Sequence, residues 1–273
     1  MWAELELLQS GSDGGTERPV LIAVAHGSRD PRSAETMSAV VADIAAARPD
    51  LDVRPAFLDL NAPSVEQVVD AVAAQRYTHA VVAPLLLGNA FHARVDLPGI
   101  LAAARARHPQ LRLTQADVLG PDPQLIEALR DRVLDAIVER DGDTDRIPGG
   151  QAFGRNDRIG IAVAAVGSSS SAANARTAEV ARRLAALTGW RTEICFATTE
   201  PTVTQAISRL HARGADRVLV APWFLAPGLL TDRLIAAAAE LVHADVIGPH
   251  PALTDVVWDR YDAAIANDLA LSA

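Results

Sequence analysis

Two histidines and one aspartate recur at intervals of 33 residues in the first half of the sequence. His26 and Asp59 each follow a short apolar run, VLIAVA or VRPAFL, and His92 follows the run HAVVAP after a loop. Such runs are typical of buried parallel strands, whose carboxyl ends share one edge of a sheet about 4.8 Å apart. We therefore expect the two imidazoles to converge. Two imidazoles with an open coordination position suit a borderline divalent ion such as Fe²⁺, Co²⁺, Ni²⁺ or Zn²⁺.

Each of these side chains also has a structural interpretation. A lone histidine at a strand end is often a hydrogen-bonded core residue, and an aspartate before Pro63 can form an Asx turn or cap the next helix. His79 begins an expected strand, and three other histidines lie near helix ends, where imidazoles contact terminal carbonyls. These three are His108, His211 and His243.

The elements that must position these groups alternate along the whole chain. Apolar runs of strand length are separated by segments with helical periodicity, which predicts βαβ units and a parallel sheet. The expected strands are 20–25, 53–58, 79–84, 112–118, 159–166, 192–197, 216–221 and 244–247. The expected helices are 31–47, 63–76, 95–107, 122–139, 172–187, 201–213, 229–242 and 252–266. Asp30 and Pro31 are typical of the N-cap and first residue of a helix.

The second half of the sequence repeats the first at an offset of about 140 residues. Shared landmarks are the pairs Gly27 and Gly167, Phe57 and Phe196, and Pro63 and Pro201. We predict an α/β fold of two tandem, similar, doubly wound parallel-sheet domains that face each other across a cleft. The second copy has Val166 in place of His26 and Leu230 in place of His92. It is therefore expected to bind no metal.

The predicted domain boundaries divide the chain into four parts. Residues 1–18 are a polar N-terminal tail, and residues 19–138 form the α/β domain that carries the metal site. Residues 139–158, dense in Gly, Asp and Arg, are a linker, and residues 159–273 are the degenerate repeat. The serine-rich turn 167–171 of that repeat suits either a phosphate-binding turn or a helix N-cap.

Composition narrows the class of protein. The 273 residues carry a net charge of −9, which disfavours nucleic acid as a partner. All 25 basic residues are Arg, so a P-loop lysine is absent and any anion site must use arginine or backbone N–H groups. The one cysteine, Cys195, cannot form an internal disulfide. We expect a cytoplasmic protein with no membrane partner, because neither a secretory signal nor a membrane-spanning run is present.

Three segments resemble the motifs of a known family. HGSR after a buried strand, FLDL followed by a proline, and APLLLGNAFHARVDLP are similar to the sirohydrochlorin and cobalt chelatase family, the CbiX/SirB type of class II tetrapyrrole chelatases. The resemblance covers residues 19–136 by motif and residues 158–266 by spacing. It implies a chelatase-like fold in its long form, in which two copies are fused into a pseudo-dimer that works as a monomer.

The resemblance also implies roles for individual residues. His26 and His92 would hold the incoming metal, and His26 would be the base for the pyrrole protons. Asp59 stands where the family often has Glu, so its catalytic carboxylate would be one methylene shorter in reach. The substrate-binding residues would be Leu87, Gly88, Asn89, Ala90 and Phe91 along the macrocycle, with Arg29 and Arg94 on its carboxylates.

Other residues have two open interpretations. Arg32 and Arg54 are further candidates for binding substrate carboxylates, although each of the four candidate arginines also suits a solvated surface position. Trp223, Phe224 and Leu225 would form an apolar wall beside the macrocycle or belong to the core.

The expected activity is ATP-independent insertion of Fe²⁺ or Co²⁺ into sirohydrochlorin or a related precorrin, in sirohaem or cobalamin biosynthesis. The divalent metal would be a substrate, and no permanently bound cofactor is expected. Two alternatives remain open: a non-catalytic metal or tetrapyrrole carrier, and a metal-free α/β enzyme that uses His26 as general acid/base.

Overall fold

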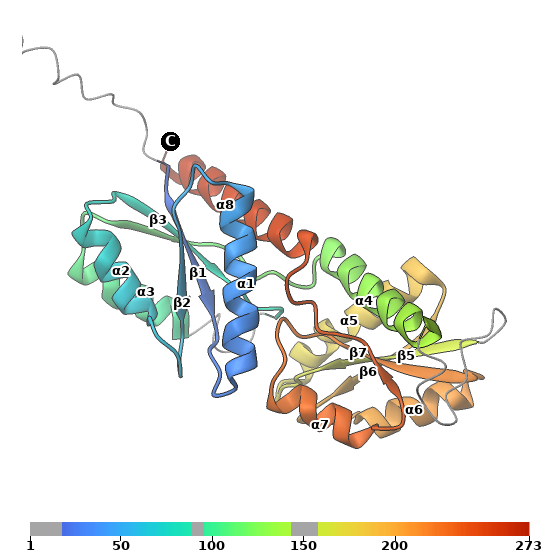
Figure 1. Ribbon diagram of the computed structural model, residues 1–273. Helices are drawn as coiled ribbons and strands as arrows, with labels where there is room; N and C mark the ends of the chain where they lie inside the picture. Colours follow the sequence, from blue (N-terminus) through green and yellow to red (C-terminus); the bar gives the residue numbers. More distant parts are fainter. Residues whose placement is uncertain (1–17, 89–95, 143–157, 273) are drawn as a thin grey trace, which may run out of the picture.

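The computed structural model describes residues 18–88, 96–142 and 158–272, which form two lobes (Figure 1). The elements of the first half are β1 (Val20–Ala25), α1 (Pro31–Ala47), β2 (Val53–Phe57), α2 (Val65–Ala74), β3 (His79–Pro84), α3 (Leu97–Arg107), β4 (Arg112–Gln115) and α4 (Pro123–Gly142). Those of the second half are β5 (Ile159–Ala165), α5 (Ser171–Thr188), β6 (Arg191–Phe196), α6 (Val203–Ala212), β7 (Arg217–Pro222), α7 (Leu229–Ala237), β8 (Val242–His243) and α8 (Pro251–Ser272).

Both halves build the same parallel sheet. The strand orders are β2-β1-β3-β4 and β6-β5-β7-β8, with four strands in each sheet. β1 pairs directly with β3, in a register that places Ala23 opposite Ala83. This order confirms the predicted α/β fold of two similar doubly wound sheets, and it makes β1 and β3 the neighbours that a shared site requires.

Some element boundaries were predicted incorrectly near the end of the second half. The last strand is the two-residue β8, not 244–247, and α7 ends at Ala237 instead of continuing to residue 242. After β8 the chain stays beside β7 and the loop that follows it, since the N–H groups of Ala244 and Ile247 donate to the carbonyls of Val220 and Phe224, and Ile247 is buried in the core. α4 also extends to Gly142, into the segment that was predicted to be a linker.

Helix starts repeat between the two halves. Asp30 is the N-cap of α1 and Pro31 its first residue, as predicted, with the carboxylate accepting a hydrogen bond from the N–H of Arg32. α2 begins with a capping box between Ser64 and Gln67. α6 begins with the equivalent box between Thr202 and Gln205. These side chains satisfy N–H groups that have no partner inside the helix.

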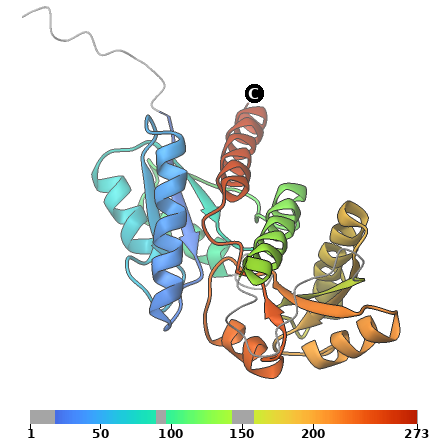
Figure 2. The ribbon, with the colours of Figure 1, turned by 45° about the vertical axis from the view of Figure 1, so that its right-hand side comes forward.

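The last helices of the two halves are exchanged. α8 packs against β3, β4 and α1 of the first half, whereas α4 packs against β7 and α5 of the second. The two exchanged helices also contact each other, and their adjacent ends meet between the two lobes in both ribbon views (Figure 2). Trp258 anchors α8 on α1, since its indole Nε1 donates to Ile44 O over 3.2 Å. The contiguous domains 19–138 and 159–273 remain a prediction, and this helix packing crosses their boundaries.

One apolar core runs through both halves. It joins α1 and α8 on a face of the first sheet to α4 and α5 on a face of the second, and it includes Leu21, Leu129, Leu219 and Trp258. The opposite faces are covered separately, by α2 and α3 in the first half and by α6 and α7 in the second. Burying a side chain of this size contributes about 1.5–3 kcal/mol, so the shared cluster fixes the two sheets relative to each other. None of the helices in the described ranges is long and apolar enough to cross a bilayer.

A buried histidine secures the end of α8. His79 Nε2 lies 2.9 Å from Thr114 Oγ1, and Arg112 Nη2 lies 3.1 Å from His79 Nδ1. Arg112 must be the donor in the second contact, which makes His79 a neutral imidazole protonated on Nε2. Arg112 also pairs with Asp268 of α8 over 2.9 Å. Burial, and then the charge of Arg112, lower the pKa of His79.

The lowered pKa of His79 predicts acid sensitivity. The unfolded chain binds a proton at this histidine once the pH falls below about 6.5, whereas the folded chain resists protonation. The free energy of unfolding should therefore be greater at pH 7.5 than at pH 5, and His79→Gln should reduce this difference. Urea titrations at both pH values measure it. An identical pH dependence in the variant would show that His79 does not gain a proton on unfolding.

Candidate active site

A cavity of about 1080 Å³ opens between the two sheets. Residues that follow four strands line it: His26 after β1, Leu85 after β3, Val166 after β5 and Trp223 after β7. The carboxyl ends of both sheets therefore face one space. In each sheet the second strand lies on one side of the first strand and the third strand lies on the other side. The cavity lies at the carboxyl ends of the strands at this change of direction, which is where open α/β sheets bind ligands. Its volume lies just above the roughly 300–1,000 Å³ that is usual for small-molecule sites.

His26 is exposed on the wall of this cavity. Its Nδ1 lies 3.2 Å from the carbonyl oxygen of Gly27. A carbonyl only accepts, so this contact favours the tautomer with the proton on Nδ1 and the lone pair on Nε2. An imidazole Nε2 in that state can accept a proton or bind a divalent metal.

Gly27 makes the tight turn that aims His26. Its φ is +93°, and a Cβ at this position would lie 1.8 Å from the carbonyl oxygen of Asp59. The N–H of Asp59 in turn donates to the carbonyl of His26 over 3.0 Å. Asn61 closes the same turn, since its Oδ1 accepts from the N–H of Ser28 at 2.7 Å. Two loops that follow neighbouring strands are thus fixed to each other.

Asp59 lies beside His26 in the backbone but not in the cavity wall. Its side chain is exposed and is absent from the described lining. Its Oδ1 accepts from the N–H of Leu60 over 2.8 Å, and its carbonyl accepts from the N–H of Asn61. This geometry matches the turn interpretation of Asp59. A catalytic role for the residue remains a prediction.

The loop after β3 is described only in part. Leu87 and Gly88 line the cavity, as expected for residues that contact a macrocycle. The other predicted residues of this loop lie outside the described residues: Asn89, Ala90, Phe91, His92 and Arg94. Within the described ranges no three His, Cys, Asp or Glu side chains gather into a metal site. The pairing of His92 with His26 therefore remains a prediction, supported by the adjacency of β1 and β3.

Three of the four candidate arginines lie in the described part of the chain, and none of these three is among the residues that line the large cavity. Arg54 is near the start of β2, at the opposite end from the site, and pairs with Asp52 over 2.5 Å. Arg32 bonds Asp30 and Asp232, and it lines a separate cavity of about 330 Å³. Arg29 is exposed and does not contribute to the described lining of the large cavity. Arg29 and Arg32 follow the HGSR motif closely in the sequence, but closeness to the motif does not determine whether a side chain points into the cavity.

The second half repeats the geometry of the turn without the imidazole. Gly167 has a φ of +91°, and the exposed side chain of Val166 lines the cavity. Ser170 is the N-cap of α5, with its hydroxyl accepting from the N–H of Ala173, which supports the cap interpretation of the serine-rich turn. Trp223 is 4% exposed, belongs to the core, and still contributes to the cavity wall.

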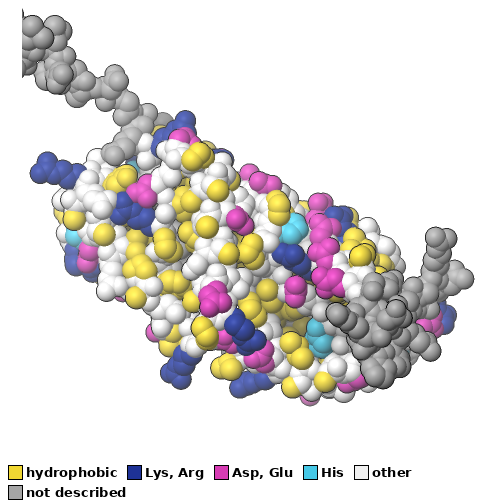
Figure 3. Space-filling model, viewed as in Figure 1, with side chains coloured by type: hydrophobic (Ala, Val, Ile, Leu, Met, Phe, Trp, Pro, Cys, Tyr) yellow, Lys and Arg dark blue, Asp and Glu magenta, His cyan; other side chains and the backbone are white. Residues whose placement is uncertain are grey.

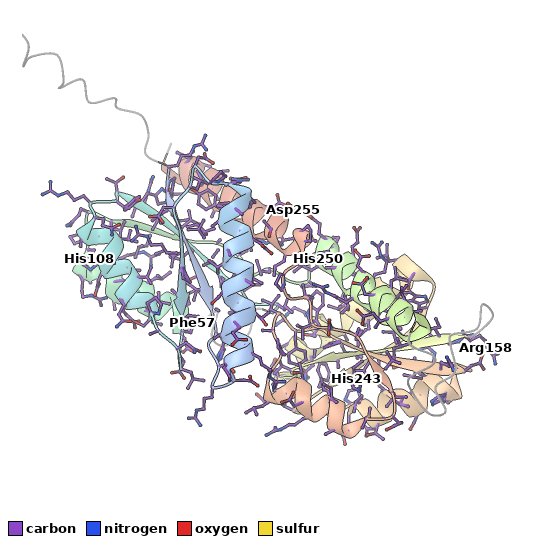
Figure 4. The ribbon with its side chains drawn as sticks, in the orientation of Figure 1. Phe57, His108, Arg158, His243, His250 and Asp255 are labelled. Atoms are coloured by element: carbon purple, nitrogen blue, oxygen red, sulfur yellow. The ribbon has the colours of Figure 1, made fainter. Side chains whose placement is uncertain are left out.

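Three other histidines have structural partners. His211 Nδ1 and His243 Nε2 lie 3.0 and 2.9 Å from the carbonyls of Ala215 and Ala238. His108 Nε2 lies 2.7 Å from Asp70 Oδ1, on the far side of the first lobe (Figure 4). These contacts agree with the structural roles expected for these three histidines.

Several residues of the cavity wall were not predicted. Asp117, just after β4, is exposed in the cavity, and Asn61, Arg176 and Arg260 also line it. Asp117 and Asn61 are polar residues that come shortly after the carboxyl end of a strand, and this position is itself a signal of the site. Arg260 lies on the exchanged helix α8, and nothing in its local sequence indicates this location. Basic and acidic side chains are interspersed over the face in Figure 3, without a continuous basic patch on that face.

The fold and the site together define a class of protein: a two-lobed α/β protein that binds a ligand between its lobes. Its features are two parallel sheets of order 2-1-3-4, exchanged end helices and one shared cavity at the strand ends. Comparison with known families gives a closer assignment. The family model of CbiX matches residues 20–136 and again residues 160–264. The chain belongs to the CbiX family.

Similar proteins align with this chain over most of their length. A sirohydrochlorin cobaltochelatase from Priestia megaterium is 24% identical over 95% of this chain and 84% of its own length. A sirohydrochlorin ferrochelatase from the same organism is 25% identical, with coverage of 89% and 90%. The solved structure of SirB from Bacillus subtilis with Fe³⁺ has a TM-score of 0.70 at 22% identity and covers 93% of this chain and 98% of that chain.

Proposed function

We propose that this protein is an ATP-independent chelatase that inserts Fe²⁺ or Co²⁺ into sirohydrochlorin or a related precorrin, in sirohaem or cobalamin biosynthesis. The observation that carries the proposal is His26 at the end of β1, on the wall of a cavity formed by both halves. Relatives that align over most of their length are named sirohydrochlorin cobaltochelatase and ferrochelatase. The metal ion is a substrate in this proposal, and no permanently bound cofactor is required.

Metal insertion requires a base and a weak metal site. Two pyrrole protons must leave the ring. The Nε2 lone pair of His26 holds the ion first, and once the ion has moved to the ring nitrogens it can accept one of these protons, while the other passes to water. With His92 as second ligand, the ion is held by two imidazoles and at most one carboxylate. Such a site releases metal more readily than a closed four-ligand cage. Asp59 Oδ1 accepts from the N–H of Leu60, which leaves Oδ2 as the oxygen with which Asp59 would contribute.

Substrate contacts in this proposal come from both halves. The residues from Leu87 to Phe91 lie along the macrocycle, and Arg29 and Arg94 are candidates for its carboxylates. The wall of the second half, which includes Val166 and Trp223, supplies an apolar surface for the ring. The chain would act in the cytoplasm as a single-chain pseudo-dimer with one productive site.

Turnover of the purified protein tests the proposal. Sirohydrochlorin is mixed with a catalytic amount of protein and with Fe²⁺, Co²⁺ or Ni²⁺, and metallation is followed by the absorption of the macrocycle. We expect many equivalents of product per protein, above the uncatalysed rate, with Fe²⁺ or Co²⁺. Product limited to one equivalent would identify a carrier. No acceleration with any metal would reject the proposed reaction.

A further inference from the structure

Two arginines lie in the described lining of the large cavity, and they differ in their partners. Arg260 of α8 donates from Nη2 to Asp122 Oδ2 over 2.8 Å and from Nε to Val118 O over 3.1 Å. Its charge is therefore already compensated by the loop between β4 and α4. The other is Arg176 of α5, which belongs to the half without the predicted metal ligands.

Arg176 is exposed and forms no ion pair with any residue that the structure describes. The nearest carboxylate along its helix, Glu179, is shared by Arg182 at 2.5 Å and Arg183 at 3.4 Å. Arg176 also lies in the second turn of α5, near the positive end of the helix dipole, where a cation gains no stabilisation. Neither an ion pair within the helix nor the helix dipole therefore explains why a cation is present at this position.

The duplication provides an internal comparison for Arg176. The offset of 140 residues that relates Gly27 to Gly167 relates Arg176 to Thr36 of α1. Thr36 is uncharged, and its hydroxyl donates to the carbonyl of Arg32, one turn earlier in the helix. The same helix therefore forms in the first half without a cation. The charge of Arg176 is not needed for the fold.

The surroundings of Arg176 favour an anionic ligand. The same cavity is also lined by Val166, Trp223 and Phe224, and apolar lining of this kind strengthens a charge interaction relative to open water. A guanidinium binds a carboxylate in a bidentate, oriented way. We infer that Arg176 binds a carboxylate side chain of the tetrapyrrole. This inference rests on the proposed function, because it takes the polycarboxylate ring as the ligand.

Binding of metal-free sirohydrochlorin to the full chain tests the inference. Arg176→Thr, which introduces the residue of the first copy, should raise the dissociation constant roughly 10- to 100-fold, as expected for loss of one charge-assisted hydrogen bond. The variant should also raise KM by a similar factor and change kcat less than about twofold. Arg176→Lys should recover part of the affinity, because it restores the charge but not the bidentate geometry.

Arg182→Thr is the matched control, on the same helix but outside the cavity lining. It should bind sirohydrochlorin as the wild type does. Binding by Arg176→Thr within twofold of the wild type would overturn the inference while leaving the proposed function intact if the wild type turns over. Tight, Arg176-dependent binding without metal insertion would support the inference and reject the proposed reaction. A wild type that does not bind the ring would reject both.

Discussion

Replacing His26 by Ala is expected to lower the rate of metal insertion roughly a thousandfold, as expected for loss of a positioned base. The variant should also bind the metal substrate more weakly, since one of the two proposed ligands is removed. Its free energy of unfolding should stay within about 0.5 kcal/mol of the wild type, because the side chain is exposed and lies outside the core. Metallation kinetics and urea unfolding measure the two effects.

His211→Ala provides the control for this experiment. His211 contacts the carbonyl of Ala215 at the end of α6 and does not line the cavity. Its removal should leave metal insertion within about twofold of the wild type. Wild-type kinetics in His26→Ala would show that another group takes the pyrrole protons, with Asp117 as the next candidate because it is exposed in the same cavity.

Gly27→Ala should be the most destabilising single substitution considered for the site. The new methyl group would lie 1.8 Å from the carbonyl of Asp59, and the φ of +93° is one that alanine rarely adopts. The carbonyl cannot move without breaking the turn that holds Ser28 and Asn61. We expect a loss of roughly 3 kcal/mol or more in the free energy of unfolding, measured by urea titration, together with loss of metal insertion.

Gly189→Ala separates backbone strain from steric overlap. Gly189 ends α5 with a φ of +74°, and a Cβ there would meet nothing within 4 Å. This variant should lose only about 1 kcal/mol, because it carries the strain alone. Equal losses in the two variants would mean that the contact with Asp59 is relieved by a small shift of the loop and does not limit stability.

The sequence was most informative where a local pattern has one physical explanation. Continuous apolar runs become strands buried on both faces, and β1 is fully buried over its length, as such runs predict. Asp30 and Pro31 start a helix because their chemistry suits a helix start in any context. The duplication is visible because the same turns recur, and the strand order of the two sheets confirms it.

Long-range arrangement was less accessible. The apolar stripe of α4 or α8 shows that each helix covers a sheet, but two similar sheets offer equivalent surfaces, so the stripe does not select between them. The exchange of these helices is therefore visible only in the structure. Arg260 and Arg176 were missed for a related reason, since each reaches the cavity from a helix whose placement depends on packing across the two halves. Arg54 is not a residue of the cavity because it lies near the start of β2, whereas the cavity lies beyond the carboxyl ends of the strands.

The position of α8 has a consequence for biosynthesis of the chain. The first sheet is complete after β4, yet the helix that covers β3 and β4 follows every other described element in the sequence. While a ribosome translates the second half, the surface formed by Leu21, Val81 and their neighbours lacks part of its cover. The first lobe therefore cannot reach its native packing until residues 251–272 leave the exit tunnel. Formation of α8, not completion of the first half, is the step that completes the cover of the first sheet.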